Sequence, residues 1–434
     1  MGYSSYVFLF GFCFLLAYIA FESISKPAHI AKIRVSSVLS TSNYLVLIGI
    51  TLVFIYLSGL KNQFLSYSPG SDSDLFIKFL DMIINGHSTP TFEIYFAAKK
   101  QAFLNLLSPL YHYIEAGSLA SIILLITLNL LFVSMICKRI IYFAKPDDKN
   151  LFHCLIILCP LTALLMVSYL RDIFAVFLVI ELAYLFHLRR FNPYSVTLIL
   201  FFSLLLFYTR SFYLVTLYLG VLVSIFSFRT VLLAAIPAVL LIVVFVDIKP
   251  ILIKLLVLHG RDAAKLGGSA LTVGVDGISD ITPLFVIKRL ALGFFTMLAT
   301  PQPGFILNDL VNSKGDWYRD VENVFQLVFS VIYVGFLLPI TACIVLTLDK
   351  HQLTTFKNSR FHFAVLTVLV FLFAVYSIKY FGVRHFKVDY ARYILWLAAL
   401  TFFPVKSLIK SKLFFVLSGS MLLLAYLVTL FVVL

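Results

Sequence analysis

The chain is built from long apolar runs separated by short polar segments. The runs lie near residues 5–21, 43–60, 118–137, 151–169, 172–188, 194–209, 212–228, 231–247, 323–347, 361–378, 393–408 and 413–434. Each run approaches the ~20 residues that an α-helix needs to cross a bilayer. The pattern therefore predicts an all-α, polytopic integral membrane protein with about 12 transmembrane helices. We expect residues 1–434 to form a single transmembrane domain.

Two segments are much longer than the other connections between runs. They cover residues 61–117 and 248–322, and the spacing of their apolar residues indicates amphipathic helices. In the first segment, a helix over 103–111 is expected to lie along the membrane surface. In the second, Thr282-Pro283 begins a run over 284–300 that is short for a span and carries charges. Such a run favours an interfacial or re-entrant helix over a transmembrane one.

Composition and charge agree with this class. The sequence is 62% hydrophobic and 12% charged, with a mean hydropathy of +1.03, which excludes a soluble globular domain. If segment 22–42 is cytoplasmic, the loops on that side hold 16 Lys and Arg against four acidic residues, and the other side holds 18 against 15. This asymmetry follows the positive-inside rule, and it places both termini outside. The net charge of +14 therefore indicates topology, not a nucleic-acid partner.

The five cysteines all fall in or at the ends of apolar runs. None lies in a predicted external loop, so the sequence implies no disulfide framework. Cys154 and Cys159 lack the neighbouring ligands of a metal site. We expect no metal and no cofactor.

Five arginines lie at or just inside the external ends of apolar runs, where such residues are scarce. They are Arg171, Arg210, Arg289, Arg384 and Arg392. A guanidinium near the hydrocarbon edge is costly unless an anion or a water-filled cavity receives it. Arginine also grips two oxygens of a diphosphate through its planar fork. The cluster therefore predicts that the protein handles a phosphorylated lipid on the outer face.

Two of these arginines mark tight turns. Arg171-Asp172 interrupts an apolar stretch over 151–188, which as one helix would measure about 57 Å, so it must fold as a hairpin. Asp172 either neutralises Arg171 and caps the next helix, or orients Arg171 toward a phosphate. Arg210 follows a run and precedes the next one with almost no loop. It either reaches lipid headgroups or binds the same phosphate.

The late external segment 379–392 also has two interpretations. It is rich in cationic and aromatic residues, which suits either a solvated loop on anionic lipid or a phosphate site. Arg392 is the better candidate within it because it immediately precedes the apolar run that begins at Tyr393.

Several other polar residues are candidates for acid–base chemistry. Asp72 and Asp74 form a D-x-D that suits a metal or a catalytic base, although the same residues are common in turns. His259, close to Arg261, suits a base beside a phosphate or a helix end. Glu181 lies in mid-span and must face a polar interior or carry a proton. The sequence contains no P-loop, H-E-x-x-H or G-x-S-x-G, so ATP-driven transport and protease or lipase chemistry lack support.

Four local motifs together suggest a family. They are the Gly-Ser-Asp turn at 70–72, the span that begins Arg171-Asp172-Ile-Phe-Ala-Val, the Tyr-Thr-Arg-Ser-Phe turn at 208–212, and Arg392-Tyr393 before a late span. In these motifs and in its layout the chain resembles the Wzy-type O-antigen and polysaccharide polymerases, including the EpsG-like branch. The resemblance implies a glycosyltransferase of the bacterial cytoplasmic (inner) membrane whose active site faces the periplasm. Such enzymes join undecaprenyl-pyrophosphate-linked repeat units into lipopolysaccharide O-antigen or a related surface polysaccharide.

The resemblance also implies roles and partners. Outward-facing arginines would clamp the pyrophosphate and stabilise it as a leaving group, and an external acid or histidine would activate the acceptor hydroxyl. The candidate clamp residues are Arg171, Arg210, Arg289, Arg384, Arg392 and Arg261, with Asp172 as the orienting residue; the candidate bases are Asp72, Asp74 and His259. The implied partners are lipid-linked glycans, the bilayer and a chain-length regulator protein.

Two other functions fit parts of the pattern. A GT-C-type glycosyltransferase would use Asp72 or Asp74 as base or metal ligand, but such enzymes place their acidic motif after the first span, which is cytoplasmic by charge here. A lipid-linked oligosaccharide flippase, which is not an enzyme, also has about 12 spans and an arginine-lined cavity. Flippases have short loops on both sides, whereas the two long external segments favour chemistry outside the cytoplasm.

Overall fold

The computed structural model describes residues 3–24, 37–59, 102–111, 113–114, 118–166, 172–188, 192–226, 306–307, 310–311, 317–380 and 386–433. All regular secondary structure in these ranges is helical. In chain order the elements are α1 (Tyr3–Ile24), α2 (Ser37–Gly59), α5 (Ala102–Tyr111), α6 (Leu119–Phe143), η2 (Pro146–Asp148), α7 (Lys149–Ile157), α8 (Pro160–Met166), α9 (Asp172–Leu188), α10 (Pro193–Ile225), α15 (Trp317–Ile332), η4 (Tyr333–Leu337), α16 (Leu338–Thr347), α17 (Lys350–Asn358), α18 (Arg360–Tyr380), α19 (Phe386–Leu400), α20 (Val405–Ile409) and α21 (Lys412–Val433). The fold class predicted from the sequence, all-α, is the one observed over the described ranges.

Several of these helices are suited to a membrane. In the described residues three are long and apolar enough to cross a bilayer, at Ala120–Phe143, Pro193–Ile225 and Asn323–Thr347, and the number rises to five if each of two bent pairs counts as one span. Outward-facing large apolar side chains accompany them. On α21, for example, Phe415, Leu424 and Leu427 are 64%, 62% and 53% exposed. Such faces are unusual on soluble monomers and consistent with a multi-pass membrane protein. The expected number of 12 spans remains a prediction.

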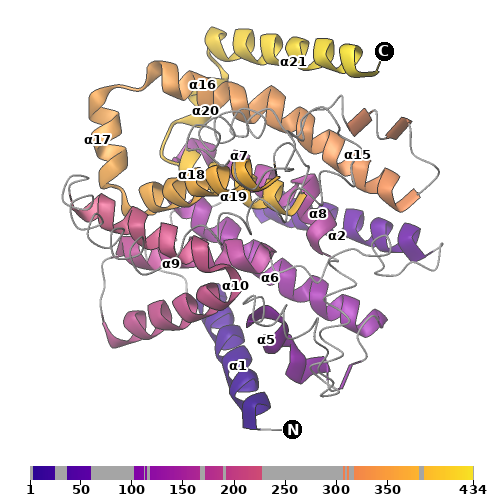
Figure 1. The fold of residues 1–434 in the computed structure, drawn as a ribbon, viewed down its shortest axis with the longest axis vertical. Helices are drawn as coiled ribbons and strands as arrows, with labels where there is room; N and C mark the ends of the chain where they lie inside the picture. The colour runs from indigo at the N-terminus through magenta and orange to yellow at the C-terminus, as the bar shows by residue number, and fades with distance from the viewer. Residues whose placement is uncertain are drawn as a thin grey trace, which may run out of the picture.

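Most of the long helices run broadly across Figure 1, with α17 at the left edge and α1 descending steeply toward the N-terminus at the bottom. α6 and α9 run in the same direction, because Phe132 contacts Phe177 at 5.0 Å and Phe143 contacts His187 at 4.8 Å between ring centroids. α18 runs the opposite way, since its first residues reach the last part of α6: Phe361 stacks on Phe143 at 3.8 Å. The bundle thus has two ends, set by the direction of each helix.

We name these ends by an arginine at each. The Arg139 end holds the C-terminal parts of α1, α6, α9 and α19, together with α17 and the start of α18. The Arg210 end holds the start of α6, α9, α15 and α19, and the bend in α10. Two segments that charge assigns to the cytoplasmic face meet at the Arg139 end, where Asp148 accepts hydrogen bonds from the backbone of Val405 and Lys406.

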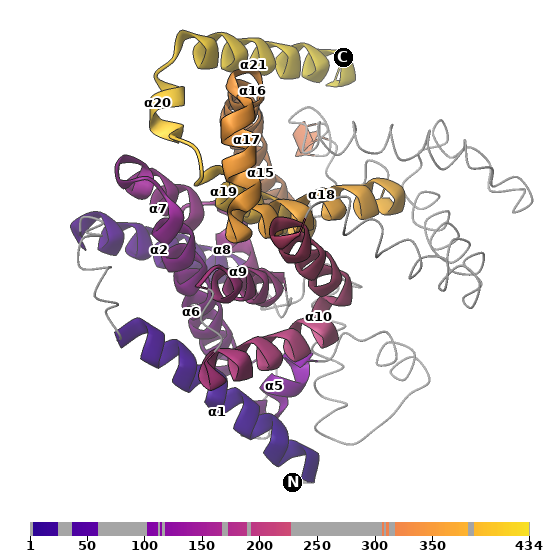
Figure 2. The same ribbon diagram turned by 90° about the vertical axis from the view of Figure 1, so that its left-hand side faces the viewer.

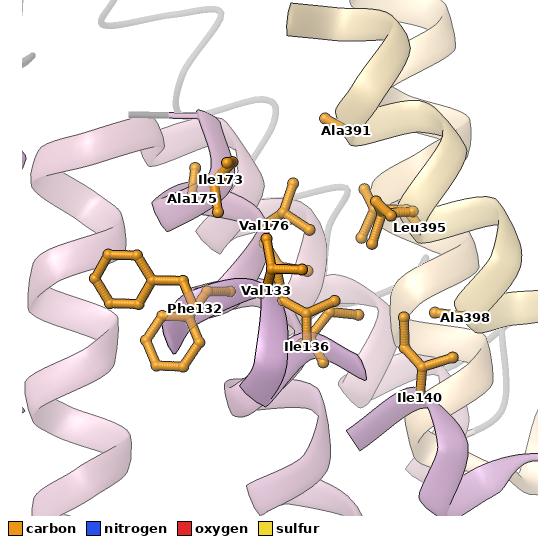
Figure 3. Packing of buried hydrophobic residues seen from close by; sticks show 14 of the residues in the cluster. Phe132, Val133, Ile136, Ile140, Ile173, Ala175, Val176, Ala391, Leu395 and Ala398 are labelled. Atoms are coloured by element: carbon orange, nitrogen blue, oxygen red, sulfur yellow. The ribbon is translucent and has the colours of Figure 1, made fainter. Parts of the chain in front are cut away.

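The core lies where α6, α9 and α19 meet. Small and branched side chains from the three helices interlock there, including Val133, Ile136, Val176 and Leu395 (Figure 3). α9 is the central helix, because all its residues from Asp172 to Phe186 are buried. A helix that is apolar around its whole circumference fits only such a position.

α10 doubles back on itself at Arg210. The backbone there leaves the helical region (φ −149°, ψ 78°), and the hydroxyls of Ser203 and Tyr218 lie 2.8 Å apart. In a straight helix two residues with this separation in sequence would lie about 22 Å apart. Figure 2 shows the two arms meeting at a sharp bend. The tight turn expected at Arg210 is therefore present.

Two other helices are interrupted at prolines. The apolar run 151–169 is not one straight helix: α7 and α8 meet at an angle of 47° just before Pro160. Pro160 cannot donate to the carbonyl of Ile156, and the hydroxyl of Thr162 donates to it instead at 3.2 Å. In the run 323–347, a π-helical segment (η4) precedes Pro339. Pro339 has no N–H to donate to the carbonyl of Gly335. That carbonyl accepts a hydrogen bond from the hydroxyl of Ser418 on α21 at 2.7 Å instead. Polar side chains thus restore the bonds that the prolines remove.

Two local expectations are corrected, and one stays a prediction. α5 is a helix as predicted, and its apolar residues Phe103, Leu106 and Leu107 are buried against protein; its position along the membrane surface stays a prediction. The segment before residue 361, expected to be a loop, contains α17, which meets α18 at 94°. α19 begins at Phe386, so Arg392 lies inside the helix and not before it. α17 and the start of α19 thus show that helical structure continues outside the apolar runs 361–378 and 393–408.

Candidate functional site

Arg210 and Asp172 form an ion pair at the Arg210 end of the bundle. The Nη2 atom of Arg210 donates to Oδ1 of Asp172 at 2.8 Å. Asp172 is the first residue of α9, and Arg210 occupies the bend of α10, so the pair joins the two successive turns predicted from the sequence. The bend contains neither proline nor glycine between Tyr208 and Phe212. We attribute its geometry to this contact and to the packing of the two arms.

The sequence left open whether Asp172 neutralises and caps or orients an arginine, and the pairing with Arg210 bears on this choice. The carboxylate contacts Arg210, which is distant in sequence, and its position at the start of α9 also suits the positive end of the helix dipole. Arg171 lies outside the described residues. The structure therefore gives Asp172 an arginine partner that the sequence did not suggest.

A second ion pair lies at the same end, on α19. Nη2 of Arg392 donates to Oδ1 of Asp389 at 2.8 Å, and the Arg392 side chain is 0% exposed. Its guanidinium also lies over the ring of Tyr333, 4.8 Å from the centroid, and 5.4 Å from that of Phe373. The ion pair and two aromatic faces compensate for burial of the charge.

Arg139, a buried arginine on α6, has a different setting. Nε of Arg139 donates to Glu181 at 2.9 Å, and Nη2 donates to Glu22 at 2.8 Å and to the hydroxyl of Tyr18 at 2.9 Å. That hydroxyl donates in turn to Glu181 at 2.7 Å. Arg139 follows the apolar run 118–137 and is one of the 16 basic residues that the charge count gives to cytoplasmic loops, but it lies within α6 and is 1% exposed. Glu181 therefore lies in the polar surroundings that the sequence predicts. Arg139 and Tyr18 donate to it directly, and Glu22 joins the same network through Arg139.

Exposure separates the three arginines. The side chain of Arg210 is 19% exposed, whereas those of Arg139 and Arg392 are 2% and 0% exposed. A guanidinium that retains exposed surface at the tip of a hairpin can contact an anion without rearrangement of the core. Of the three, Arg210 is the one placed to bind a ligand in this conformation.

The other predicted site residues lie outside the described ranges. They are Asp72, Asp74, Arg171, His259, Arg261, Arg289 and Arg384. Among the candidates, the structure therefore places Asp172, Arg210 and Arg392, all at the same end of the bundle, and it joins the first two directly.

Sequence reasoning identified none of the carboxylate–arginine pairs seen in the described residues. Asp389 precedes Arg392 by three residues, a spacing that places both on one face of a helix, so this pair could have been recognised once α19 was extended to Phe386. The partnership of Glu181 with Arg139 spans two helices. Only the packing of α6 on α9 reveals it.

No protein family model, curated protein or solved structure matches this chain.

Proposed function

We propose that this chain is a polysaccharide polymerase of the bacterial inner membrane, with about 12 transmembrane helices and its active site at the Arg210 end, facing the periplasm. It joins undecaprenyl-pyrophosphate-linked repeat units into a surface polysaccharide. The observation that carries the proposal is the contact between Arg210 and Asp172 at the tips of two adjacent helical turns. The motifs shared with Wzy-type polymerases and the apolar helices support it.

The proposed reaction is a glycosyl transfer that needs a stabilised leaving group and a general base. The oxygen of an acceptor hydroxyl attacks the anomeric carbon of the lipid-linked glycan, and the bond from that carbon to the diphosphate oxygen breaks. The electron pair leaves with the lipid diphosphate, while the hydroxyl proton passes to a general base. Asp72, Asp74 and His259 remain the candidate bases.

Arg210 stabilises the diphosphate as its negative charge increases. A guanidinium does this well because its fork binds two oxygens and stays charged at all physiological pH values. Asp172 holds the side chain of Arg210 near the start of α9. Arg171, adjacent to Asp172 in sequence, is expected to complete the clamp.

The proposal is tested by a panel of Arg210→Ala, Arg171→Ala and Asp72→Ala in a strain that lacks this gene, scored for glycan chain length. Loss of the Arg210 fork is expected to slow the transfer about 100-fold, so that single-repeat glycans replace long chains. Arg210→Lys keeps the charge but loses the fork, and it is expected to give chains of intermediate length. Lys410→Ala, at an exposed residue of the Arg139 end, is the charge-matched control.

The location of the accumulating glycan distinguishes a polymerase from a flippase. A defective polymerase leaves single repeats on the outer side, whereas a defective flippase leaves them inside. Normal long chains in all three alanine variants, at wild-type protein levels, would refute the proposed mechanism.

A further inference from the structure

α17 lies across the Arg139 end of the bundle. It meets α18 at 94°, and at the left edge of Figure 1 it crosses the direction of most long helices. The elements on both sides of it are apolar. Val345 and Leu346, near the end of α16, are 67% and 66% exposed, and the apolar run 361–378 begins three residues after α17 ends. α17 therefore lies at right angles to α18, at the edge of the apolar part of the bundle.

One side of α17 is packed against protein. The ring of Phe356 is buried, and its centroid lies 5.1 Å from that of Phe402 and 5.8 Å from that of Phe403. These two residues lie between α19 and α20. The contact fixes which side of α17 faces the bundle and which side faces outward.

The outward side combines an apolar residue with two bases. Leu353 is 55% exposed, and Lys350 and Lys357 stand three residues before it and four residues after it. Residues at this spacing share one side of a helix. We call Lys350, Leu353 and Lys357 the outer face of α17. A leucine between two lysines is typical of helices that lie in a membrane interface.

The positive charge of the outer face is not neutralised within the described ranges, whose ion pairs include neither lysine. The neighbouring carboxylate of Asp349 caps the helix, because its Oδ1 atom accepts a hydrogen bond from the backbone of Gln352 at 2.6 Å. Lys406 and Lys410, both exposed on α20, add further positive charge just beyond Phe403. An anion is the complementary partner.

The combination of leucine and lysine selects among anions. A soluble anion would contact the lysines but leave Leu353 in water, and a neutral lipid would contact Leu353 but not the charges. An anionic phospholipid satisfies both, because a leucine enters the acyl boundary while lysine side chains extend to the phosphate groups. Each lysine near such a surface contributes about 1 kcal/mol of attraction.

We propose that the outer face of α17 binds anionic phospholipid in the leaflet at the Arg139 end. Leu353 lies in the acyl boundary, and Lys350 and Lys357 contact lipid phosphates. The inference goes beyond the proposed polymerase and does not depend on the reaction at the Arg210 end. It gives α17 the role of fixing the depth of the Arg139 end in the membrane.

The test uses a fluorescent probe on a single cysteine in nanodiscs. Leu353→Cys is made in a background in which the five native cysteines are replaced by alanine. Brominated phosphatidylglycerol and brominated phosphatidylcholine, which quench only probes that they contact, are compared at equal mole fraction. Both are expected to quench the probe, and the anionic lipid more strongly. Thr355→Cys, exposed and on nearly the opposite side of α17, is the matched control, and neither lipid is expected to quench it.

The lysines are then tested in the same background. Lys350→Gln and Lys357→Gln are each expected to reduce the preference for phosphatidylglycerol about fivefold, which corresponds to about 1 kcal/mol. Lys350→Arg keeps the charge and is expected to keep the preference. Salt at about 1 M shortens the Debye length to about 3 Å, so it is expected to weaken the preference as well. Because Lys350 is exposed, Lys350→Gln is expected to unfold at the same temperature as its parent.

Three results would overturn the inference. Equal quenching of the Leu353→Cys probe by both lipids would show contact with the membrane without selection of charge. No quenching by either lipid would remove α17 from the acyl boundary. A probe that a soluble quencher reaches in nanodiscs but not in native membranes would show that a protein partner covers the outer face. Each of these results leaves the polymerase proposal intact, because that proposal is scored by glycan chain length.

Discussion

Three arginine side chains of this protein, Arg139, Arg392 and Arg210, differ in their partners and in how much of the guanidinium is exposed. Arg139 uses its donors on two carboxylates and a tyrosine, and Arg392 combines a carboxylate with two aromatic faces. Arg210 combines an ion pair with partial exposure at a bend. At the residue scale, a buried arginine in an apolar chain indicates either a structural ion pair or a binding site. Exposure of the guanidinium distinguishes them here.

The network around Arg139 gives a prediction about stability. Arg139→Leu leaves the buried carboxylate of Glu181 without its counter-ion, and Glu181→Leu removes one of the two carboxylates that neutralise Arg139. Arg139→Leu is expected to lower the free energy of unfolding by about 3–5 kcal/mol, because the buried charge of Glu181 is then uncompensated. Glu181→Leu is expected to lower it by less, because Glu22 still pairs with Arg139. Thermal unfolding in detergent measures the effect.

The double variant distinguishes pairing from packing. Arg139→Leu with Glu181→Leu removes both charges, so its loss of stability is expected to be smaller than the sum of the two single losses. Lys350→Ala, at an exposed position of α17, serves as the control and is expected to change stability by less than about 0.5 kcal/mol. Additive losses in the double variant would contradict the interpretation that the two residues act as an ion pair.

At the scale of elements, close packing of α10 on α18 depends on a glycine. A Cβ atom at Gly220 would lie 2.8 Å from the Cα atom of Ala364 and 2.8 Å from Oγ1 of Thr367. The backbone atom cannot move without shifting α18. Gly220 therefore allows the second arm of α10 to approach α18, as small residues do at interfaces between membrane helices.

Gly220→Ala is accordingly expected to destabilise the protein by about 1–3 kcal/mol, because the two helices must separate to accept the methyl group. The matched control is Gly419→Ala on α21, where the new Cβ meets no described atom within 4 Å other than those of its own stretch of helix. That variant is expected to be neutral or more stable by up to about 1 kcal/mol, since alanine favours a helix over glycine. Monodispersity and unfolding temperature after purification measure both. Equal behaviour of the two variants would contradict the close approach.

The sequence predicted which segments are helical better than it predicted how they meet. Apolar runs located α1, α9 and α21 within a few residues and missed one end of α2 and of α6 by six, because hydrophobic thickness sets the apolar length of a helix but not its polar ends. The break before Pro160 and the location of Arg392 within α19 were not predicted. Both depend on hydrogen bonds and ion pairs between segments that are distant in sequence. For the same reason the turn at Arg210 was predicted, but its contact with Asp172 was not.

At the scale of the whole molecule, the two ends differ in composition as well as in geometry. The Arg139 end gathers segments that charge counting assigned to the cytoplasm, such as those around Lys145 and Lys406, and Asp148 accepts hydrogen bonds there from the backbone of Val405 and Lys406. The Arg210 end gathers the starts of α9 and α19, where arginines pair with carboxylates. Helix direction and charge distribution are independent properties of the chain. Their agreement supports a single orientation in the membrane.

That orientation gives a last prediction, tested by single cysteines in a background in which Cys13, Cys137, Cys154, Cys159 and Cys343 are replaced by alanine. Tyr113→Cys is placed before α6, where Tyr113 is 81% exposed, and Gln352→Cys is placed on the exposed surface of α17. In intact spheroplasts a membrane-impermeant maleimide is expected to label only the first, because basic loops remain in the cytoplasm. Both are expected to react after the membrane is disrupted.

The reverse labelling pattern would have a specific consequence. It would place Arg210 and Asp172 in contact with the cytoplasm, where the transfer proposed for the outer face does not occur. The arginines would then bind a different anion, and the resemblance to polymerases would no longer explain them. Labelling of both cysteines in intact spheroplasts would instead show that the two ends of the bundle do not lie on opposite sides of a membrane. Only labelling restricted to Tyr113→Cys agrees with charge distribution, helix direction and the proposed site together.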